Sequence, residues 1–345
     1  MDKNLFKNPP AKFRGAPFWG WNGKITEKEL ESQIETFKKM GFGGYHIHPR
    51  TGMDTAYMSD EYMQLVKCCV EKGKSEGMYT YLYDEDRWPS GFGGGLVTKN
   101  PEYRSRQLLL TPVSYAEYGE VNPEPKFSVT NQRAGNGPLA ACYDIVLDEN
   151  GFLKSFDKIG ENDAAKGTKW YAYAETALSS PWFNGYTNVD VLNPDATDEF
   201  IKVTHQRYYE AVGEDFGKYI PSIFGDEAQV TFKKMLNAPF DKTDVILAWT
   251  PKMPEEYESF YNGNIFDILP LLVWEGNGSA AARYRYHNLV AELFARNYID
   301  RIGKWCREHN IKFTGHMISE GSLEGQTCNI GDVMRAYRGL AVPGV

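Results

Sequence analysis

Short apolar stretches alternate with longer amphipathic stretches over the first 85 residues. In the amphipathic stretches apolar residues recur at helical spacing, which predicts helices over residues 26–41 and 59–77. Thr26 stands three residues before Glu29, as in a capping box. Short links between such elements are typical of right-handed parallel βαβ units. The apolar stretches predicted to be strands are residues 16–21, 43–48 and 79–84.

This pattern changes between residues 103 and 185, where no helical period is found. Asp148-Glu-Asn-Gly151 has the composition of a hairpin turn between two strand-like stretches. We interpret 103–185 as a small β-rich subdomain inserted after the third strand, with 1–102 and 186–345 forming the main domain. The strands predicted within it cover residues 107–115, 142–147, 152–156 and 169–174.

The alternation of strands and helices resumes after residue 186. Residues 228–279 interrupt it with a stretch rich in Pro, Gly and aromatic residues, which we predict to be irregular. The further strands are predicted at 187–192, 219–227, 311–319 and 340–345, and the helices at 193–212, 280–309 and 332–338.

Six strands and the start of a seventh predict an α/β fold of the (β/α)8 TIM-barrel type, incomplete at its C-terminal end. A doubly wound open sheet is the alternative. Polar residues at most strand ends, and the lack of a Gly-rich dinucleotide turn after the first strand, favour the barrel. We therefore expect the chain to be a fragment of a longer protein.

Composition narrows the function classes. The chain has 345 residues, 42% of them hydrophobic, and can bury a large core. Its formal net charge is −8 with no basic stripe, so we expect no nucleic-acid partner. No stretch approaches the ~18 apolar residues of a membrane span and the N-terminal residues have no apolar signal segment, so we expect no membrane partner and a cytoplasmic location. Five cysteines without C-x-x-C spacing are expected to be reduced.

The strand predicted at 219–227 ends in Asp226 and Glu227, and other predicted strands also end in polar residues. Two carboxyl groups facing each other across a barrel mouth are what acetal hydrolysis needs. Strand alternation places Asp226 on the opposite side from Glu227, as an orienting partner. Polar residues at the predicted strand ends are Asn22, His46, His48, Arg50, Asp84, Glu85, Asp86, Asn193, Asp226, Glu227, His316 and Glu320.

Five tryptophans lie in or near the predicted mouth, where each either stacks on a sugar or packs in the core. They are Trp19, Trp21, Trp88, Trp182 and Trp274. The residues expected to contact a sugar are His46, His48, Arg50, Asp84, Glu85, Trp88, Asn193, Asp226 and His316.

Three stretches have alternative interpretations. His46-Ile-His48 has the spacing of a zinc-binding strand end, although only His316 among the other histidines stands at a predicted strand end; contacts to sugar hydroxyls or buried structural roles are the alternatives. Asp84-Glu-Asp86 has oxygens suited to calcium, or pairs with Arg87. Ser90-Gly-Phe-Gly-Gly-Gly95 lacks the features of a phosphate loop and is predicted to be a flexible turn.

Several blocks together resemble the catalytic barrel of glycoside hydrolase family 106, the α-L-rhamnosidase type. They are Pro17-Phe-Trp-Gly-Trp-Asn-Gly23, Gly43-Gly-Tyr-His-Ile-His-Pro-Arg-Thr-Gly52, Tyr83-Asp-Glu-Asp-Arg-Trp-Pro-Ser-Gly91, Leu192-Asn-Pro194 and Phe224-Gly-Asp-Glu227. The resemblance implies inverting, exo-acting cleavage of a terminal deoxy-sugar from a carbohydrate, with Glu227 as acid, Glu320 as base and calcium as an aid. It also implies a longer protein with β-sandwich domains after the barrel.

Two other functions remain open at this point. One is a metal-dependent barrel hydrolase that uses His46 and His48. The other is a truncated, inactive remnant that only binds sugar.

Overall fold

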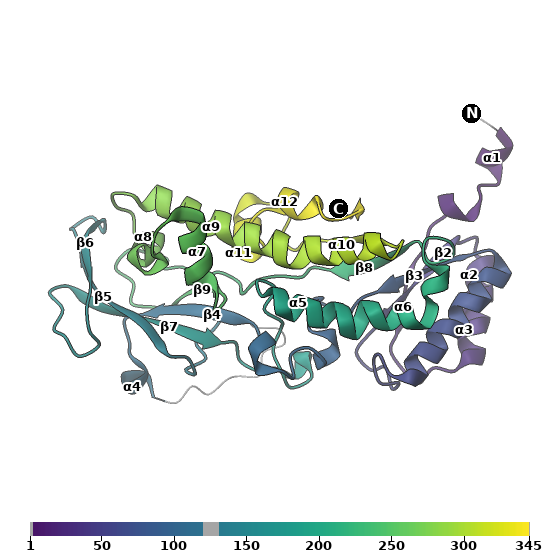
Figure 1. Ribbon diagram of the computed structural model, residues 1–345, viewed down its shortest axis with the longest axis horizontal. Coiled ribbons are helices and arrows are strands. Elements are labelled where there is room, and N and C mark those ends of the chain that lie inside the picture. The colour runs from purple at the N-terminus through teal and green to yellow at the C-terminus, as the bar shows by residue number, and fades with distance from the viewer. Residues whose placement is uncertain (1–2, 120–130, 345) are drawn as a thin grey trace.

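The centre of the molecule is a six-stranded parallel sheet in the order β1-β2-β3-β8-β10-β11, seen in a computed structural model that describes residues 3–119 and 131–344 (Figure 1). The parallel α/β organisation predicted from the sequence is confirmed. Among the described residues the sheet stays open, with β1 and β11 at its edges, and no closed barrel forms. The strands are β1 (Phe18–Trp21), β2 (Gly44–Pro49), β3 (Tyr79–Tyr83), β8 (Ser222–Asp226), β10 (Lys312–His316) and β11 (Val342–Pro343).

The first two crossover helices begin and end where the sequence predicts. Helix α2 (Glu27–Lys39) begins with the reciprocal hydrogen bonds of a capping box between Thr26 and Glu29. Helix α3 (Asp60–Glu76) is capped by the Ser59 side chain and ends at Gly77, whose φ of 64° is left-handed. The βαβαβ order predicted for the first 85 residues is therefore confirmed.

The strand predicted at residues 187–192 is wrong, because β3 pairs directly with β8 in the sheet. This stretch makes a single bridge, from Val189 to Arg104. The side chains of Asn188 and Asp190 accept hydrogen bonds from nearby backbone amides, which replaces strand pairing with local turns. Val189 and Val191 are buried, although this stretch belongs to neither sheet.

Two long helical stretches run along the molecule, and each contains a π-helical segment (Figure 1). The first stretch is α5 (Pro194–Phe200), the π segment Ile201–His205 and α6 (Gln206–Val212). The second is α9 (Ser279–Phe294), the π segment Ala295–Ile299 and α10 (Asp300–Glu308). Both stretches match predicted helices. The remaining α-helices are α1 (Lys3–Lys7), α4 (Tyr115–Tyr118), α7 (Met253–Tyr261), α8 (Leu269–Val273), α11 (Leu323–Asn329) and α12 (Val333–Tyr337).

A second, antiparallel sheet lies at the opposite end of the molecule from β1 and β2 (Figure 1). Its strand order is β6-β5-β7-β4-β9, and one buried apolar cluster runs from it to the parallel sheet. The predicted hairpin turn at Asp148–Gly151 joins β5 to β6. Its strands are β4 (Arg106–Thr111), β5 (Leu139–Leu147), β6 (Leu153–Lys158), β7 (Thr168–Thr176) and β9 (Val245–Trp249).

Strand β9 lies within the stretch 228–279 that the sequence predicts to be irregular, and that prediction is wrong. The segment Val245-Ile-Leu-Ala-Trp249 is buried throughout and pairs with β4, so the second sheet is built from two separate parts of the chain. Helices α7 and α8 lie in the same stretch. No helix in the described parts of the chain has the length and apolar character needed to cross a membrane.

Strands β8 and β10 pair with glycine opposite glycine, and there is no room for a side chain on Gly315. Gly225 is the register partner of Gly315, and the next pair is Asp226 with His316. A Cβ atom on Gly315 would lie 2.0 Å from the backbone oxygen of Gly225, far inside van der Waals contact. The glycine pair therefore sets the distance between the two strands immediately before their polar ends.

Replacing Gly315 with alanine should lower the free energy of unfolding by about 2 kcal/mol or more, because the added methyl group forces the two strands apart. Urea denaturation of the 345-residue chain measures the change. Gly321→Ala is the matched control, since a Cβ atom there meets nothing within 4 Å. Equal stability of the two variants would contradict this account of the strand pair.

Candidate active site

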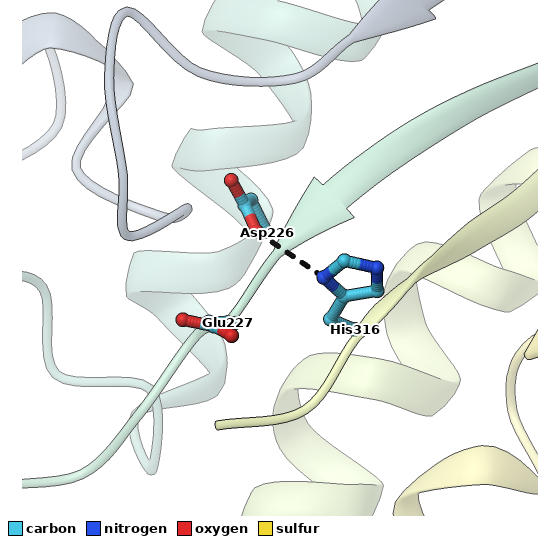
Figure 2. Close-up of side chains that lie close together, drawn as sticks. All are labelled: Asp226, Glu227 and His316. Carbon is cyan, nitrogen blue, oxygen red and sulfur yellow. Dashed lines mark ion pairs between the residues drawn. The ribbon is translucent and has the colours of Figure 1, made fainter. Parts of the chain in front are cut away.

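Three polar side chains meet at the carboxyl ends of β8 and β10: Asp226, Glu227 and His316 (Figure 2). One ligand atom from each lies within 4.8 Å of the others. The parallel register places His316 beside Asp226, with Nδ1 of the imidazole 4.0 Å from Oδ1 of the carboxylate. All three side chains are partly exposed, so they are open to a ligand.

Glu227 follows the last residue of β8 and has a left-handed backbone, with φ at 53°. Strand alternation no longer applies beyond the strand end, and the expectation that Asp226 and Glu227 point to opposite sides is wrong. A positive φ in a residue other than glycine is an unfavourable conformation, and such residues cluster at functional sites. The backbone turn at Glu227 is what brings both acids to the same place.

The carboxyl group of Glu227 is held by the indole of Trp88, whose Nε1 donates a hydrogen bond of 2.5 Å to Oε2. Burial raises the pKa of Glu227 above its ordinary value, and the Trp88 hydrogen bond acts against that rise. The nearby negative charges of Asp226 and Glu320 raise the pKa of Glu227 further, whereas His316 lowers it. A carboxyl group in this setting keeps its proton to higher pH, as a general acid must.

Asp226 is fixed by groups from the β3 strand and the loop after it. The hydroxyl of Tyr83 donates a hydrogen bond of 2.6 Å to Oδ2 of Asp226. Ser90 binds both backbone groups of Asp226. The Ser90 Oγ accepts a hydrogen bond of 2.7 Å from the Asp226 N–H, and the Ser90 N–H donates a hydrogen bond of 2.8 Å to the Asp226 carbonyl. Burial raises the pKa of Asp226, and the Tyr83 hydrogen bond opposes that rise.

Glu320 lies after β10 and accepts a short hydrogen bond from the hydroxyl of Tyr337 on α12. Its backbone carbonyl accepts from Gln326 in α11, and Ser319 just before it has a left-handed φ of 56°. The negative charge of Glu320 raises the pKa of Glu227, an effect smaller than those of burial, Trp88, Asp226 and His316.

Glu85 is fully buried and takes no part in the open site. Four backbone N–H groups donate to its carboxylate, from Asp86, Gly91, Gly93 and Gly94, at 2.6–2.9 Å. The glycines of residues 91–95 have positive φ where they wrap around it. The flexible turn predicted for Ser90–Gly95 is therefore wrong, because an internal carboxylate orders the loop. Asp86 pairs with Arg87, one of the two arrangements expected from the sequence.

His46 and His48 line the face of the sheet among aromatic rings. His46 stacks on Tyr81 with ring centroids 4.6 Å apart, and His48 lies 4.1 Å from Tyr83. Burial lowers the pKa of each imidazole to about 4, so both are neutral. Among the residues described, the guanidinium of Arg50 has neither a hydrogen bond nor an ion pair, although its charge acts on His48 and Asp226.

Of the other residues predicted to contact sugar, some lie at the acid cluster of Asp226 and Glu227 and others have structural roles away from it. Trp88 binds Glu227, and Trp182 donates its indole N–H to the Trp88 carbonyl. Asp84 is fully buried beneath the strand ends. Asn193 caps α5 through the Asp195 N–H, which is a structural role. The tryptophans at 19, 21 and 274 are buried in the core.

Three residues that hold the acids are not predicted from the sequence: Tyr83, Ser90 and Tyr337. A signal existed for Tyr83, because the tyrosines at 79, 81 and 83 alternate along β3 and so share one face of the sheet. No local pattern marks Ser90 or Tyr337, whose contacts cross between distant parts of the chain.

A cation could be held by Asp226, Glu227 and His316, the group of three that emerges among the described residues. Calcium prefers six to eight oxygen ligands, and an imidazole nitrogen with two carboxylates suits a transition metal better. The carboxyl groups of Glu85 and Asp86 are engaged with protein donors, and Asp84 is fully buried with only one of its oxygens bonded, to Ser90. The residues present therefore do not fit calcium, and no step below uses it.

The solved structure of a rhamnosidase from Novosphingobium sp. PP1Y is similar to this chain, with a TM-score of 0.58 and 13% sequence identity over 98% of this chain and 48% of the rhamnosidase. The similarity shows a shared fold, and the chain spans about half the length of that protein. Two further solved structures are too dissimilar to support an argument. A trehalulose synthase has a TM-score of 0.34 and 12% identity over 90% of this chain and 45% of the synthase. An alpha-N-acetylgalactosaminidase from Bifidobacterium bifidum has a TM-score of 0.30 and 10% identity over 94% of this chain and 39% of that enzyme. No protein-family model and no curated protein matches the chain.

Replacing Glu85 with glutamine should reduce the free energy of unfolding by about 3 kcal/mol or more. The side-chain NH2 group would face two backbone N–H donors that have no other acceptor. Chemical denaturation measures the loss, and Glu149→Gln in the exposed hairpin turn is the control with the same change of charge. A Glu85 variant as stable as that control would show that the loop is held in some other way.

The pKa of Glu227 should move in opposite directions in two variants. Asp226→Asn removes a neighbouring negative charge, so the pKa of Glu227 should fall. His316→Gln removes a group that favours the carboxylate form of Glu227, so the pKa of Glu227 should rise. The indole ¹⁵N–¹H signal of Trp88 reports the titration, since that N–H is bonded to Glu227. Shifts of the same sign in both variants would be inconsistent with the electrostatic description of the site.

Proposed function

We propose that this chain carries the catalytic carboxyl groups of a glycoside hydrolase that removes a terminal deoxy-sugar, of the α-L-rhamnoside type, with inversion. The observation that carries the proposal is the environment of the Glu227 carboxyl group. That carboxyl group is half-buried, bonded to an indole, held by a left-handed backbone and raised in pKa by burial, with the charges of Asp226 and, more weakly, Glu320 adding to the rise. The fold shared with a rhamnosidase supports the choice of substrate class.

In this proposal Glu227 is the general acid. It gives its proton to the glycosidic oxygen while the bond from that oxygen to the anomeric carbon breaks. Glu320 is the general base, which takes a proton from the water that attacks the anomeric carbon on the opposite face. Inversion requires the two carboxyl groups to be about 6.5–9.5 Å apart, whereas retention requires about 5–5.5 Å.

Other residues of the proposed site bind the sugar and exclude water. The unpaired guanidinium of Arg50 offers donors to hydroxyl groups, and Trp88 offers a ring edge beside the acid. His46 and His48, neutral by burial, present ring nitrogens rather than charge. Asp226 sits beside Glu227 and keeps its proton affinity high.

A second candidate is metal-dependent hydrolysis, favoured by the Asp226, Glu227 and His316 cluster rather than by the predicted His46-x-His48 pair. A transition metal bound there would lower the pKa of a water ligand and make it a nucleophile. Elemental analysis of the purified chain decides between the two: stoichiometric zinc, manganese or iron supports the metal, and its absence with retained turnover supports the two-carboxyl mechanism.

Glu227→Gln and Glu320→Gln should each reduce kcat/KM for an aryl α-L-rhamnoside by 100-fold or more, the usual contribution of a general acid or base. The loss in Glu227→Gln should be larger for an alkyl rhamnoside, whose poorer leaving group needs the proton more, while the loss in Glu320→Gln should not depend on the leaving group.

The assay is run on the 345-residue chain and on any longer natural polypeptide that contains it. The exposed Glu324→Gln is the control. Activity of both active-site variants within tenfold of wild type would remove the assignment, and sugar binding without any turnover would favour a binding protein.

A further inference from the structure

The carboxyl group of Asp84 lies directly beneath the site, and one of its oxygens has no partner. Asp84 follows β3, is fully buried, and its Oδ2 would lie 3.1 Å from a Cβ atom on Gly225. Nε2 of His205, which is also fully buried, lies 4.0 Å from Oδ2. Neither atom has a hydrogen bond to any other described residue. Two unsatisfied buried polar atoms that face each other need an explanation.

The hydrogen bonds around His205 fix where its ring proton lies. Thr204 Oγ1 donates to the Phe200 carbonyl at 2.7 Å, and a carbonyl only accepts. The same hydroxyl lies 2.7 Å from Nδ1 of His205, so it must accept there and Nδ1 must carry the proton. In the neutral ring, Nε2 is then a bare acceptor directed at Asp84.

The same reasoning applies to the other oxygen of Asp84. Ser90 Oγ accepts from the Asp226 N–H, so its own hydrogen is free to donate, and it lies 2.5 Å from Oδ1 of Asp84. Oδ1 is therefore an acceptor that is already used. Oδ2 would be a second acceptor facing the lone pair of His205, a repulsive arrangement unless a proton lies between them.

We propose that Asp84 is a neutral carboxylic acid whose proton, on Oδ2, is donated to Nε2 of His205, and that this acid positions the end of β8 through Ser90. Closing the separation to a hydrogen bond takes a movement of roughly 1 Å. The positioning role rests on the proposed function of Glu227, whereas the shared proton does not. The chain of contacts runs from His205 through Asp84 and Ser90 to the backbone of Asp226.

The surroundings favour the neutral pair over an imidazolium and a carboxylate. Burial raises the pKa of Asp84 to about 8 and lowers that of His205 to about 3. The titratable groups that act electrostatically with Asp84 are acids and neutral hydroxyls or thiols, with no cation among them in the described chain. They are Tyr57, Tyr83, Glu85, Tyr208, Asp226, Tyr298 and Cys306.

Asp84→Asn is the decisive variant, because asparagine copies the protonated acid. Its Oδ1 can accept from Ser90 and its NH2 can donate to Nε2 of His205. We expect Asp84→Asn to fold and to be at least as stable as wild type in urea at pH 8, while Asp84→Ala and the neighbouring Glu85→Gln have lower midpoints. Asp84→Asn as unstable as Asp84→Ala would overturn the proposal.

The pH dependence gives a second test. Between about pH 4 and 6.5 the unfolded His205 carries the one proton that the folded pair holds, so the pair contributes no slope there. Between about pH 6.5 and 8 only the folded pair holds a proton, so the wild-type chain loses stability as pH rises. The urea midpoint of Asp84→Asn minus that of wild type should grow across this window. A constant difference would contradict the shared proton.

Nuclear magnetic resonance tests both halves of the proposal without an activity assay. In the ¹⁵N-labelled chain, His205 should show a protonated Nδ1, an unprotonated Nε2 and no titration from pH 5 to 7; protonation of both nitrogens at pH 7 would overturn the shared proton. The Trp88 indole signal should keep its position and titration in Asp84→Asn and change in Asp84→Ala. An unchanged signal in Asp84→Ala would overturn the positioning role.

Discussion

The site depends on the close pairing of β8 with β10. Two facing glycines let the strands approach, and the next register pair is then Asp226 with His316. Because the pairing is parallel, both strands release their polar ends at the same edge of the sheet, where Glu227 and Glu320 follow. The chemistry of the molecule therefore rests on a backbone contact that involves no side chain at all.

A layer of buried carboxyl groups supports this edge from below. Glu85 orders the glycine loop through four amides, and that loop carries Trp88 and Ser90, which hold Glu227 and Asp226 in turn. Asp84 reaches the same serine from the interior. Burying the carboxyl group of Glu85 costs free energy, which the four amide donors offset. Loop, strand end and interior are thus one connected polar network.

Sequence patterns predicted the βαβαβ start, the helix caps, the hairpin turn and the acid pair at the end of β8, because these depend on local spacing. They did not predict β9, whose partner β4 lies more than a hundred residues earlier, although its five apolar residues were a visible signal. The stretch 187–192 is not a strand, although its alternating valines are buried as they would be in a sheet. The hydrogen bonds of Glu85 and Ser90 depend on the folded loop, which no periodicity reveals.

The two π-helical segments set the angular phase of the helices that contain them. The hydrogen bonds of a π segment span five residues in place of four, so each segment accommodates one extra residue, and an α-helix turns by about 100° per residue. His205 is the last residue of the first segment, and Tyr208 and Val212 in the helix after it are buried in the core. Loss of a single residue there would rotate everything downstream by a quarter turn or more, so the length of this segment constrains the chain as strongly as its composition.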